Sequence, residues 1–152
     1  MDFREIFFTY KYLTIPFVSW VAAQALKFII DLIVRRKIDY RRLLGSGGMP
    51  SSHSAFVVSL STVVGIGVGF ESALFGVTLA FSLIVIYDAA GVRRAAGKQA
   101  KVLNRMFHHN KGKGEFHLEE DLKELIGHTP VEVIAGALLG LAISVLLLVV
   151  VK

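Results

Sequence analysis

Cysteine is missing from this chain of 152 residues, which excludes disulfides and thiolate metal sites. Proline is scarce too, with three residues, and tryptophan occurs once. Charged residues are few: they make up 19% of the chain, whereas 54% of the residues are hydrophobic. That balance, with a mean hydropathy of +0.61, is too apolar for an ordinary soluble domain and indicates an integral membrane protein.

The net charge of +5 would also fit a nucleic-acid-binding protein. The basic residues, however, cluster at the ends of apolar segments, as they do in membrane proteins. We therefore expect the bilayer, and no nucleic acid, as a partner. No cleavable signal peptide is expected, because no small-residue cleavage site follows an early apolar run.

Four apolar segments approach the roughly 20 residues that a membrane-spanning helix needs: 14–34, 54–70, 71–87 and 131–151. The second and third are separated only by a short turn and predict a helical hairpin. Five Lys or Arg residues lie in 35–53 and eight in 89–129, against none in 70–72. The positive-inside rule then places the two basic loops in the cytoplasm and both termini outside.

The long basic loop predicts further helices. Residues 89–106 carry Arg94, Lys98, Lys101 and Arg105 on one stripe, which is typical of a helix beneath acidic headgroups. A polar break follows at 108–114, and 117–126 is amphipathic again. The expected architecture is an all-α membrane bundle in one domain, 1–152, with about four transmembrane helices and amphipathic interfacial helices.

Two polar segments next to the spans suit phosphate. A glycine-rich stretch, 45–54, ends in Ser51, Ser52 and His53 at a helix start, where free backbone N–H groups favour an anion. The alternative is a flexible loop with a serine N-cap and an interfacial histidine. Arg93 and Arg94 follow the third span and either bind phosphate or simply anchor the helix.

Acidic residues near these segments are expected to have partners. Asp88, at the end of an apolar span, is expected to pair with one of the two arginines that follow it. Lys27 lies inside the first span, and Asp31, four residues later, is the structural partner that spacing suggests. Both carboxylates are also candidate ion partners at a site. The alternative for Lys27 is a polar cavity.

A third polar segment opens the last span. Thr129, Pro130 and Glu132 form a capping box, with threonine at N-cap, proline at N1 and glutamate at N3. His128 directly precedes it, and Glu132 can reach back toward that ring. The alternative makes Glu132 a capping acceptor only and His128 a bystander. If the topology is right, His53 falls on the same side of the membrane, and two histidines with several cations suit phosphoryl transfer without a metal or other cofactor.

Three blocks of sequence carry a resemblance: Gly-Gly-Met-Pro-Ser-Ser-His-Ser-Ala at 47–55, Tyr-Asp-Ala-Ala-Gly-Val-Arg-Arg-Ala-Ala-Gly at 87–97, and Gly-His-Thr-Pro-Val-Glu-Val at 127–133. The chain resembles the superfamily of type 2 phosphatidic acid phosphatases and vanadium haloperoxidases. It is most similar to the divergent branch, a group of small bacterial and plant membrane proteins. The blocks span most of the chain.

The resemblance implies roles. His128 would be the nucleophile, Glu132 its orienting carboxylate and His53 the general acid, while Lys27, with Arg35, would take the place of the lysine-arginine motif. Several positions depart from the superfamily pattern. Ser52 stands where glycine is usual, and the arginine of the third motif precedes the histidine by six residues there, but by 34 residues here.

The implied function is hydrolysis of a lipid phosphate or diphosphate, such as phosphatidylglycerol phosphate, phosphatidate or an isoprenoid diphosphate, on the cytoplasmic side of a bacterial cell membrane. Two alternatives come from other classes. One is a binding protein or transporter that recognises a phosphorylated lipid without hydrolysing it. The other is a membrane adaptor, since Gly136-x-x-x-Gly140 supports either helix packing or oligomerisation. A homodimer is expected because four helices provide few walls for a lipid cavity.

Overall fold

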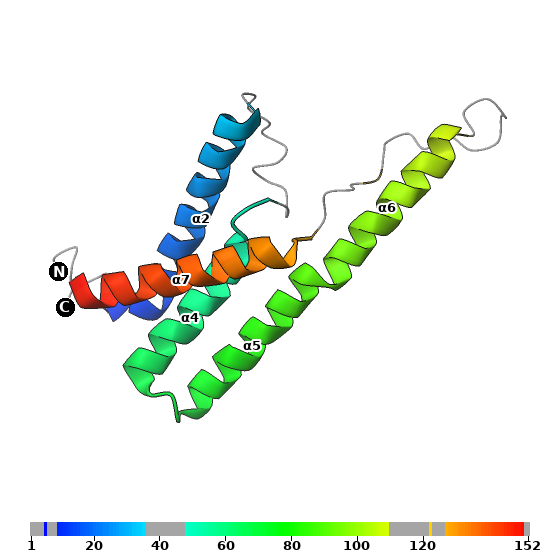
Figure 1. Cartoon of the computed structure of the whole chain (residues 1–152). Helices are drawn as coiled ribbons and strands as arrows, with labels where there is room; N and C mark the ends of the chain where they lie inside the picture. The colour runs from blue at the N-terminus through cyan, green and yellow to red at the C-terminus, as the bar shows by residue number, and fades with distance from the viewer. Residues whose placement is uncertain (1–4, 6–8, 36–47, 110–121, 123–126, 151–152) are drawn as a thin grey trace.

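The computed structural model describes residues 5, 9–35, 48–109, 122 and 127–150, and the regular structure in these ranges is helical. The helices are α2 (Lys11–Arg35), α4 (Ser52–Val68), α5 (Ala73–Ala90), α6 (Val92–His109) and α7 (Pro130–Val150) (Figure 1). The predicted all-α class is confirmed. A four-residue turn, Gly69–Ser72, joins α4 to α5, as the sequence predicts.

Length and composition make three of the described stretches candidate membrane spans: Lys11–Val34, Ala73–Phe107 and Pro130–Val150. The second of these runs through α5 and α6 together. Helix α4 is apolar but has only 17 residues. All four expected apolar segments are therefore helices, and three of them have spanning length.

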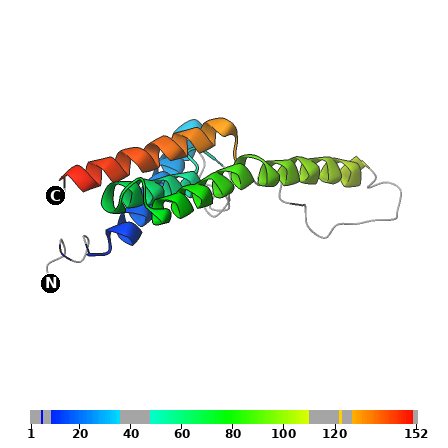
Figure 2. The same ribbon diagram turned by 90° about the horizontal axis from the view of Figure 1, so that it is seen from below.

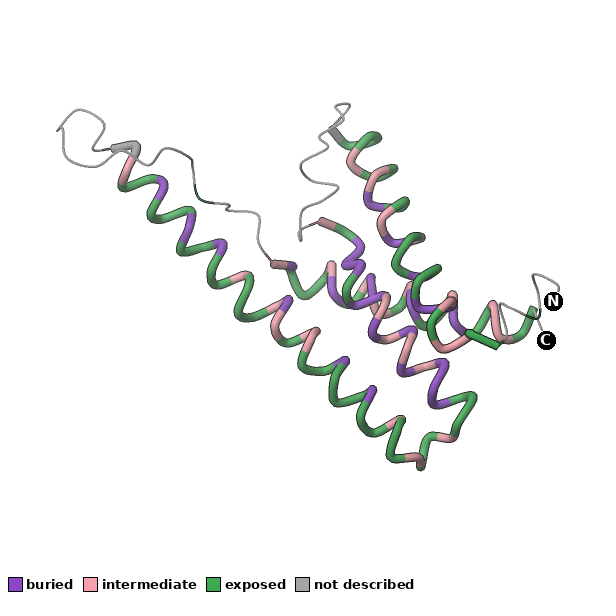
Figure 3. The backbone as a smooth tube through the Cα atoms, turned by 180° about the vertical axis from the view of Figure 1, so that it is seen from behind, coloured by how far each residue is buried: buried purple, intermediate pink, exposed green. Residues whose placement is uncertain are grey.

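Helix α4 lies at the centre and packs against α2, α5 and α7. Its small polar side chains allow close approach, because a short hydroxyl-bearing residue keeps neighbouring backbones near each other and bonds across the interface. The buried Ser59 hydroxyl lies 3.0 Å from that of Ser19 on α2 and 2.7 Å from that of Ser144 on α7. Figure 3 accordingly shows most of α4 as buried, whereas α5 is largely exposed.

Two glycines bring α7 against α4. A Cβ added at Gly136 would lie 2.2 Å from the Ser51 carbonyl oxygen, and one at Gly140 would lie 2.2 Å from the Ala55 carbonyl oxygen. Both glycines are buried. Of the two roles that the sequence allows for this motif, the structure uses packing within one chain. The homodimer stays a prediction, and this motif does not carry it.

Gly136→Ala is expected to destabilise the bundle, because neither backbone in that contact can shift without disturbing a helix start. Overpacking of this kind costs about 1–3 kcal/mol of unfolding free energy. Thermal unfolding in detergent measures it. Gly76→Ala on α5 is the matched control, since a Cβ there meets nothing within 4 Å. Equal melting temperatures for the two variants would contradict the close α4–α7 contact.

Helix α6 continues the direction of α5 and extends beyond the rest of the bundle (Figures 1 and 2). Only Gly91 interrupts the two helices. The predicted helix over 89–106 is therefore present, but it runs on to His109, so the first residues of the predicted polar break are helical. The rest of that break lies outside the described residues, as does the amphipathic segment 117–126 except for Leu122.

Successive helices of the bundle run in alternating directions. The start of α2 and the end of α7 lie on one side of the bundle. The start of α7 lies away from that side, near the end of α5 (Figure 1). The two basic loops of the sequence thus leave from the same region of the fold. The assignment of that region to the cytoplasm stays a prediction.

Candidate active site

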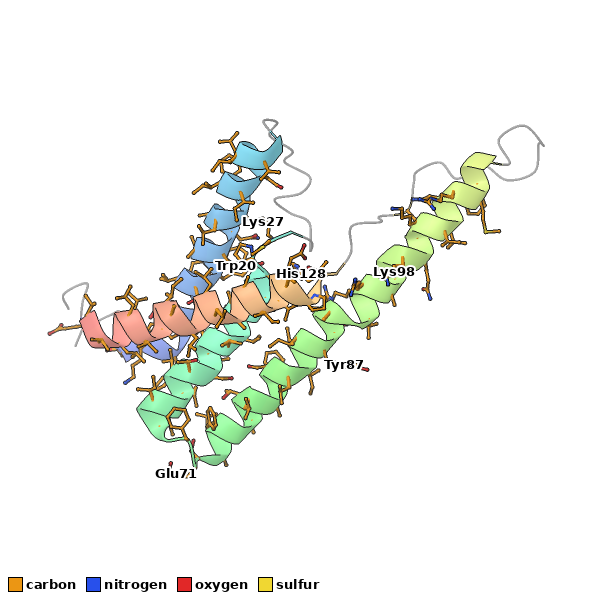
Figure 4. The ribbon with its side chains drawn as sticks, in the orientation of Figure 1. Trp20, Lys27, Glu71, Tyr87, Lys98 and His128 are labelled. Carbon is orange, nitrogen blue, oxygen red and sulfur yellow. The ribbon has the colours of Figure 1, made fainter. Side chains whose placement is uncertain are left out.

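The three polar segments meet at the start of α7. The His128 backbone N–H donates to the Ala89 carbonyl at the end of α5, at 2.9 Å. The Ser51 N–H donates to the Glu132 carbonyl, also at 2.9 Å. Figure 4 shows His128 and Lys27 in this region, with Glu71 at the far end of the bundle. Residues far apart in the sequence therefore share one end of the fold.

Gly127 holds this junction together. Its φ of +94° lies in the left-handed region that glycine adopts without strain. A Cβ at this position would lie 2.4 Å from the Arg94 nitrogen, so the chain can pass this close to α6 only as glycine. The sequence suggests a helix C-cap for Gly127. The structure adds that this glycine sets His128 against the α5–α6 junction.

Glu132 serves two partners with one oxygen. Its Oε2 accepts from the Thr129 N–H at 3.0 Å, and its own N–H donates to the Thr129 hydroxyl at 3.3 Å, which completes the predicted capping box. The same Oε2 lies 3.1 Å from His128 Nδ1. Glu132 is therefore both the capping acceptor and the carboxylate that orients the histidine, and His128 is not a bystander.

The His128 ring is buried, with 2% of its surface exposed. With Nδ1–H donating to the carboxylate, the neutral ring carries its lone pair on Nε2. That nitrogen is buried and has no hydrogen-bond partner among the described residues. The Gly48 carbonyl weakly favours the protonated ring but does not meet hydrogen-bond geometry with Nε2. An unpaired, oriented nitrogen is what a nucleophile requires.

Burial lowers the pKa of His128 below the ordinary histidine value, against the opposing effect of its bond to Glu132. The positive charge of Lys27 lowers this pKa further. Because the pKa falls, the neutral form persists to lower pH than for a free histidine. The Nε2 lone pair is therefore available at neutral pH.

His53 lies in the first turn of α4 and is exposed. Its ring centroid is 6.3 Å from that of His128, in an edge arrangement. Partial burial lowers the pKa of His53, the charges of Arg93, His128 and Lys27 lower it further, and Asp88 opposes them. One exposed and one buried histidine thus lie beside each other, near two cations and a carboxylate.

Lys27, on α2, belongs to the same end of the fold as the two histidines, and only 3% of its surface is exposed. Its stem passes Gly48, where an added Cβ would lie 3.3 Å from Lys27 Cδ. Lys27 interacts electrostatically with Glu132 at the site and with Asp31 on its own helix. The site and the i+4 partner that the sequence suggests therefore share this lysine. The Arg35 side chain lies outside the described part of the structure.

Asp88 forms the expected ion pair, and its partner is Arg93, through Nε. Both side chains are partly exposed, at 37% and 47%. Arg94 instead contributes its backbone, which Gly127 contacts. Of the two arginines, Arg93 is the one whose side chain is fixed toward the site by a partner.

The serines at the start of α4 have different roles. Ser51 is the N-cap, and its hydroxyl accepts from both the Ser54 N–H, at 3.3 Å, and the Ser54 hydroxyl, at 3.0 Å. The serine N-cap that the sequence offers as an alternative is therefore present. Ser52, the first helical residue, is buried. An anion at this end would meet the unpaired N–H groups of the first helical turn.

Some contributions could not be read from the sequence. The Ala89 carbonyl anchors His128, and the Gly48 backbone borders both Lys27 and His128. Backbone groups carry no residue-type signal, so only the fold reveals them. Within the described residues, no group of three or more His, Cys, Asp or Glu side chains is arranged to hold a metal ion.

Comparison with known proteins assigns the chain to a family. A family model described as the Divergent PAP2 family matches residues 8–143. A protein of Bacillus subtilis (strain 168), named as the uncharacterized membrane protein YuiD, is 43% identical over 137 residues, which cover 84% of this chain and 87% of the relative. No solved structure matches the chain.

Proposed function

The chain belongs to the divergent PAP2 family of membrane proteins, and we propose that it hydrolyses a lipid phosphate or diphosphate through a histidine nucleophile. The substrate class is that of phosphatidylglycerol phosphate, phosphatidate or an isoprenoid diphosphate. One observation carries the proposal. His128 has its Nδ1 held by Glu132 and its Nε2 unpaired, 6.3 Å between ring centroids from a second histidine.

In the first step, the Nε2 lone pair of His128 attacks the terminal phosphorus, and the bond from that phosphorus to the leaving oxygen breaks. His53, protonated beside the negative phosphate, donates its proton to that oxygen, which leaves as a lipid alcohol or, from a diphosphate, as a lipid monophosphate. Attack requires roughly 3–3.5 Å between reacting atoms, and proton donation about 2.6–3.2 Å. The spacing of the two rings suits one phosphoryl group held between them.

In the second step, water hydrolyses the phosphohistidine. His53, now neutral, accepts a proton from the water, whose oxygen bonds to phosphorus as the bond to Nε2 breaks. Inorganic phosphate leaves, and both histidines return to their starting forms. Glu132 stabilises the positive charge that the His128 ring carries while it is phosphorylated.

Cations at the site suit the phosphoryl oxygens. Lys27 and Arg93 are the lysine and arginine that interact electrostatically with His53, and both are drawn to negative charge developing there. The N–H groups at the start of α4, at Ser52 and His53, add a partial positive charge. Arg94 is the second arginine that can take part. We place this site at headgroup level on the cytoplasmic side of a bacterial membrane.

Phosphate release from purified protein tests the proposal. Wild type in lipid nanodiscs is expected to release phosphate from at least one of the three lipid classes, with chelator present. Lys27→Gln is expected to lower that rate about 10²-fold, because it removes one charge that stabilises the transition state. Lys11→Gln, at the opposite end of the same helix, should leave the rate unchanged. Folded protein that releases phosphate from none of these lipids would contradict the proposal.

A non-catalytic lipid-binding protein or transporter is the second candidate. The separation of Arg94 from His128 by 34 residues, against six in related phosphatases, favours it. The fold offsets that separation, since Gly127 contacts the Arg94 backbone. Binding of a lipid phosphate without turnover, lost in Lys27→Gln, would favour this candidate over the enzyme.

A further inference from the structure

Helix α6 has three distinct faces. Its 18 residues include no acidic side chain. At 100° per residue, one face is basic and the opposite face is apolar. The basic face consists of Arg94, Lys98, Lys101 and Arg105. The apolar face consists of Val92, Ala95, Ala96, Val102, Leu103 and Met106, with the polar Gln99 in its middle.

The third face is already covered by the chain itself. Gly97, Ala100 and Asn104 are buried. The Asn104 side chain makes two hydrogen bonds with the Leu122 backbone, donating to its carbonyl at 2.9 Å and accepting from its N–H at 3.0 Å. Leu122 therefore lies on a face that is neither the basic nor the apolar one.

The apolar face remains open. Val92, Val102 and Met106 are 60%, 57% and 59% exposed, and Leu103 is 42% exposed. Exposed residues along α6 are visible in Figure 3, on the part of the helix that extends beyond the bundle in Figure 2. The three large apolar residues at 102, 103 and 106 form an open patch on one side of Gln99, and covering such a patch removes hydrocarbon from water.

A second copy of the chain is a poor cover for this face. Packing two such helices together would bring two sets of basic residues close, with no acidic residue on either helix to compensate. An acidic bilayer surface satisfies both faces at once. Its headgroups attract the cations, and its acyl boundary takes up the apolar side chains.

We propose that α6 is an anionic-lipid-binding element that lies along the acidic surface of the membrane. Val102, Leu103 and Met106 enter the headgroup–acyl boundary, and the basic face contacts lipid phosphates beside it. In the structure α6 continues the direction of α5, so this orientation requires the two helix axes to diverge at Gly91, the one-residue interruption between them. The ligand is the anionic headgroup itself, and the proposal does not depend on phosphatase activity.

The absence of cysteine makes a direct test clean, because each variant carries one labelling site. Val102→Cys and Lys101→Cys, on the apolar and basic faces, are labelled with an environment-sensitive fluorophore. Each is placed at one protein per nanodisc, with phosphatidylcholine alone or with added phosphatidylglycerol. The label at 102 should shift to the blue and resist aqueous iodide only when phosphatidylglycerol is present. The label at 101 should stay accessible.

Charge variants in the Val102→Cys background test the basic face. Each Lys or Arg near an acidic surface contributes about fivefold to partitioning, so Lys98→Gln, Lys101→Gln and Arg105→Gln together should weaken it about 100-fold. Lys98→Arg, Lys101→Arg and Arg105→Lys together preserve charge and should preserve protection. Protection that is absent, that is equal in both lipids, or that requires two proteins per disc would overturn the proposal.

Discussion

His128→Asn is expected to reduce phosphate release about 10⁴-fold or more, because it removes the nitrogen that attacks phosphorus. The asparagine amide lies near the position of Nδ1, so it can still donate to Glu132. The capping box and the contact of the backbone with Ala89 do not involve the ring. Loss of activity should therefore occur in a protein that folds and melts as the wild type does.

Transfer of a phosphorus label to the protein separates the roles of the two histidines. Wild type should acquire acid-labile, alkali-stable label from labelled substrate, and His128→Asn should acquire none. His53→Asn should accumulate label when the leaving group needs no acid, since the water that clears the intermediate then lacks its base. Label on His128→Asn but not on His53→Asn would reverse the assignment of nucleophile and acid.

Much of the fold follows from the sequence because its signals are local. Apolar segments of spanning length predict the helices, and Thr129 with Glu132 predicts a capping box that forms with both of its hydrogen bonds. The serine N-cap at Ser51 is readable in the same way. Each cap depends on residues within four positions of each other, and each apolar segment on one continuous stretch. The order of residues along the chain is therefore enough to predict them.

Partner choice across the bundle could not be predicted. The spacing of Lys27 and Asp31 points to a pair on one helix, and the structure adds an electrostatic interaction of the lysine with Glu132 from α7. The Gly136 and Gly140 pattern indicates a close helix contact without saying whose helix, and the structure assigns it to α4. Periodicity reports which face a residue occupies, whereas the identity of the facing helix depends on how the helices assemble.

The site shows the same division. The sequence singles out the polar segments around His53, Asp88 and His128, and their residue types suggest phosphoryl transfer. The sequence does not reveal the junction that joins these segments, because that junction depends on the Ala89 carbonyl and on the missing side chain of Gly127. That junction brings the Arg94 backbone against Gly127, the residue before His128.

Glu132→Gln is expected to slow phosphate release about 10³-fold with little change in folding stability. A glutamine oxygen can still accept from the Thr129 N–H, so the helix start keeps its cap. What is lost is the negative charge that stabilises the His128 ring as it becomes positive during attack. The loss should appear mainly in kcat. Glu71→Gln, which changes a carboxylate at the far end of the bundle, should leave kcat unaltered.

The pH profile of Glu132→Gln distinguishes this stabilising role from simple control of protonation. Glu132 raises the pKa of His128 through its hydrogen bond and its charge, so its removal lets that pKa fall further. The fraction of neutral nucleophile then increases at every pH, and the acidic limb of the profile should move to lower pH. Raising the pH cannot restore the rate, because the ring is already neutral. Recovery of wild-type kcat at high pH would instead mean that Glu132 acts only on ionisation and does not stabilise the phosphorylated histidine.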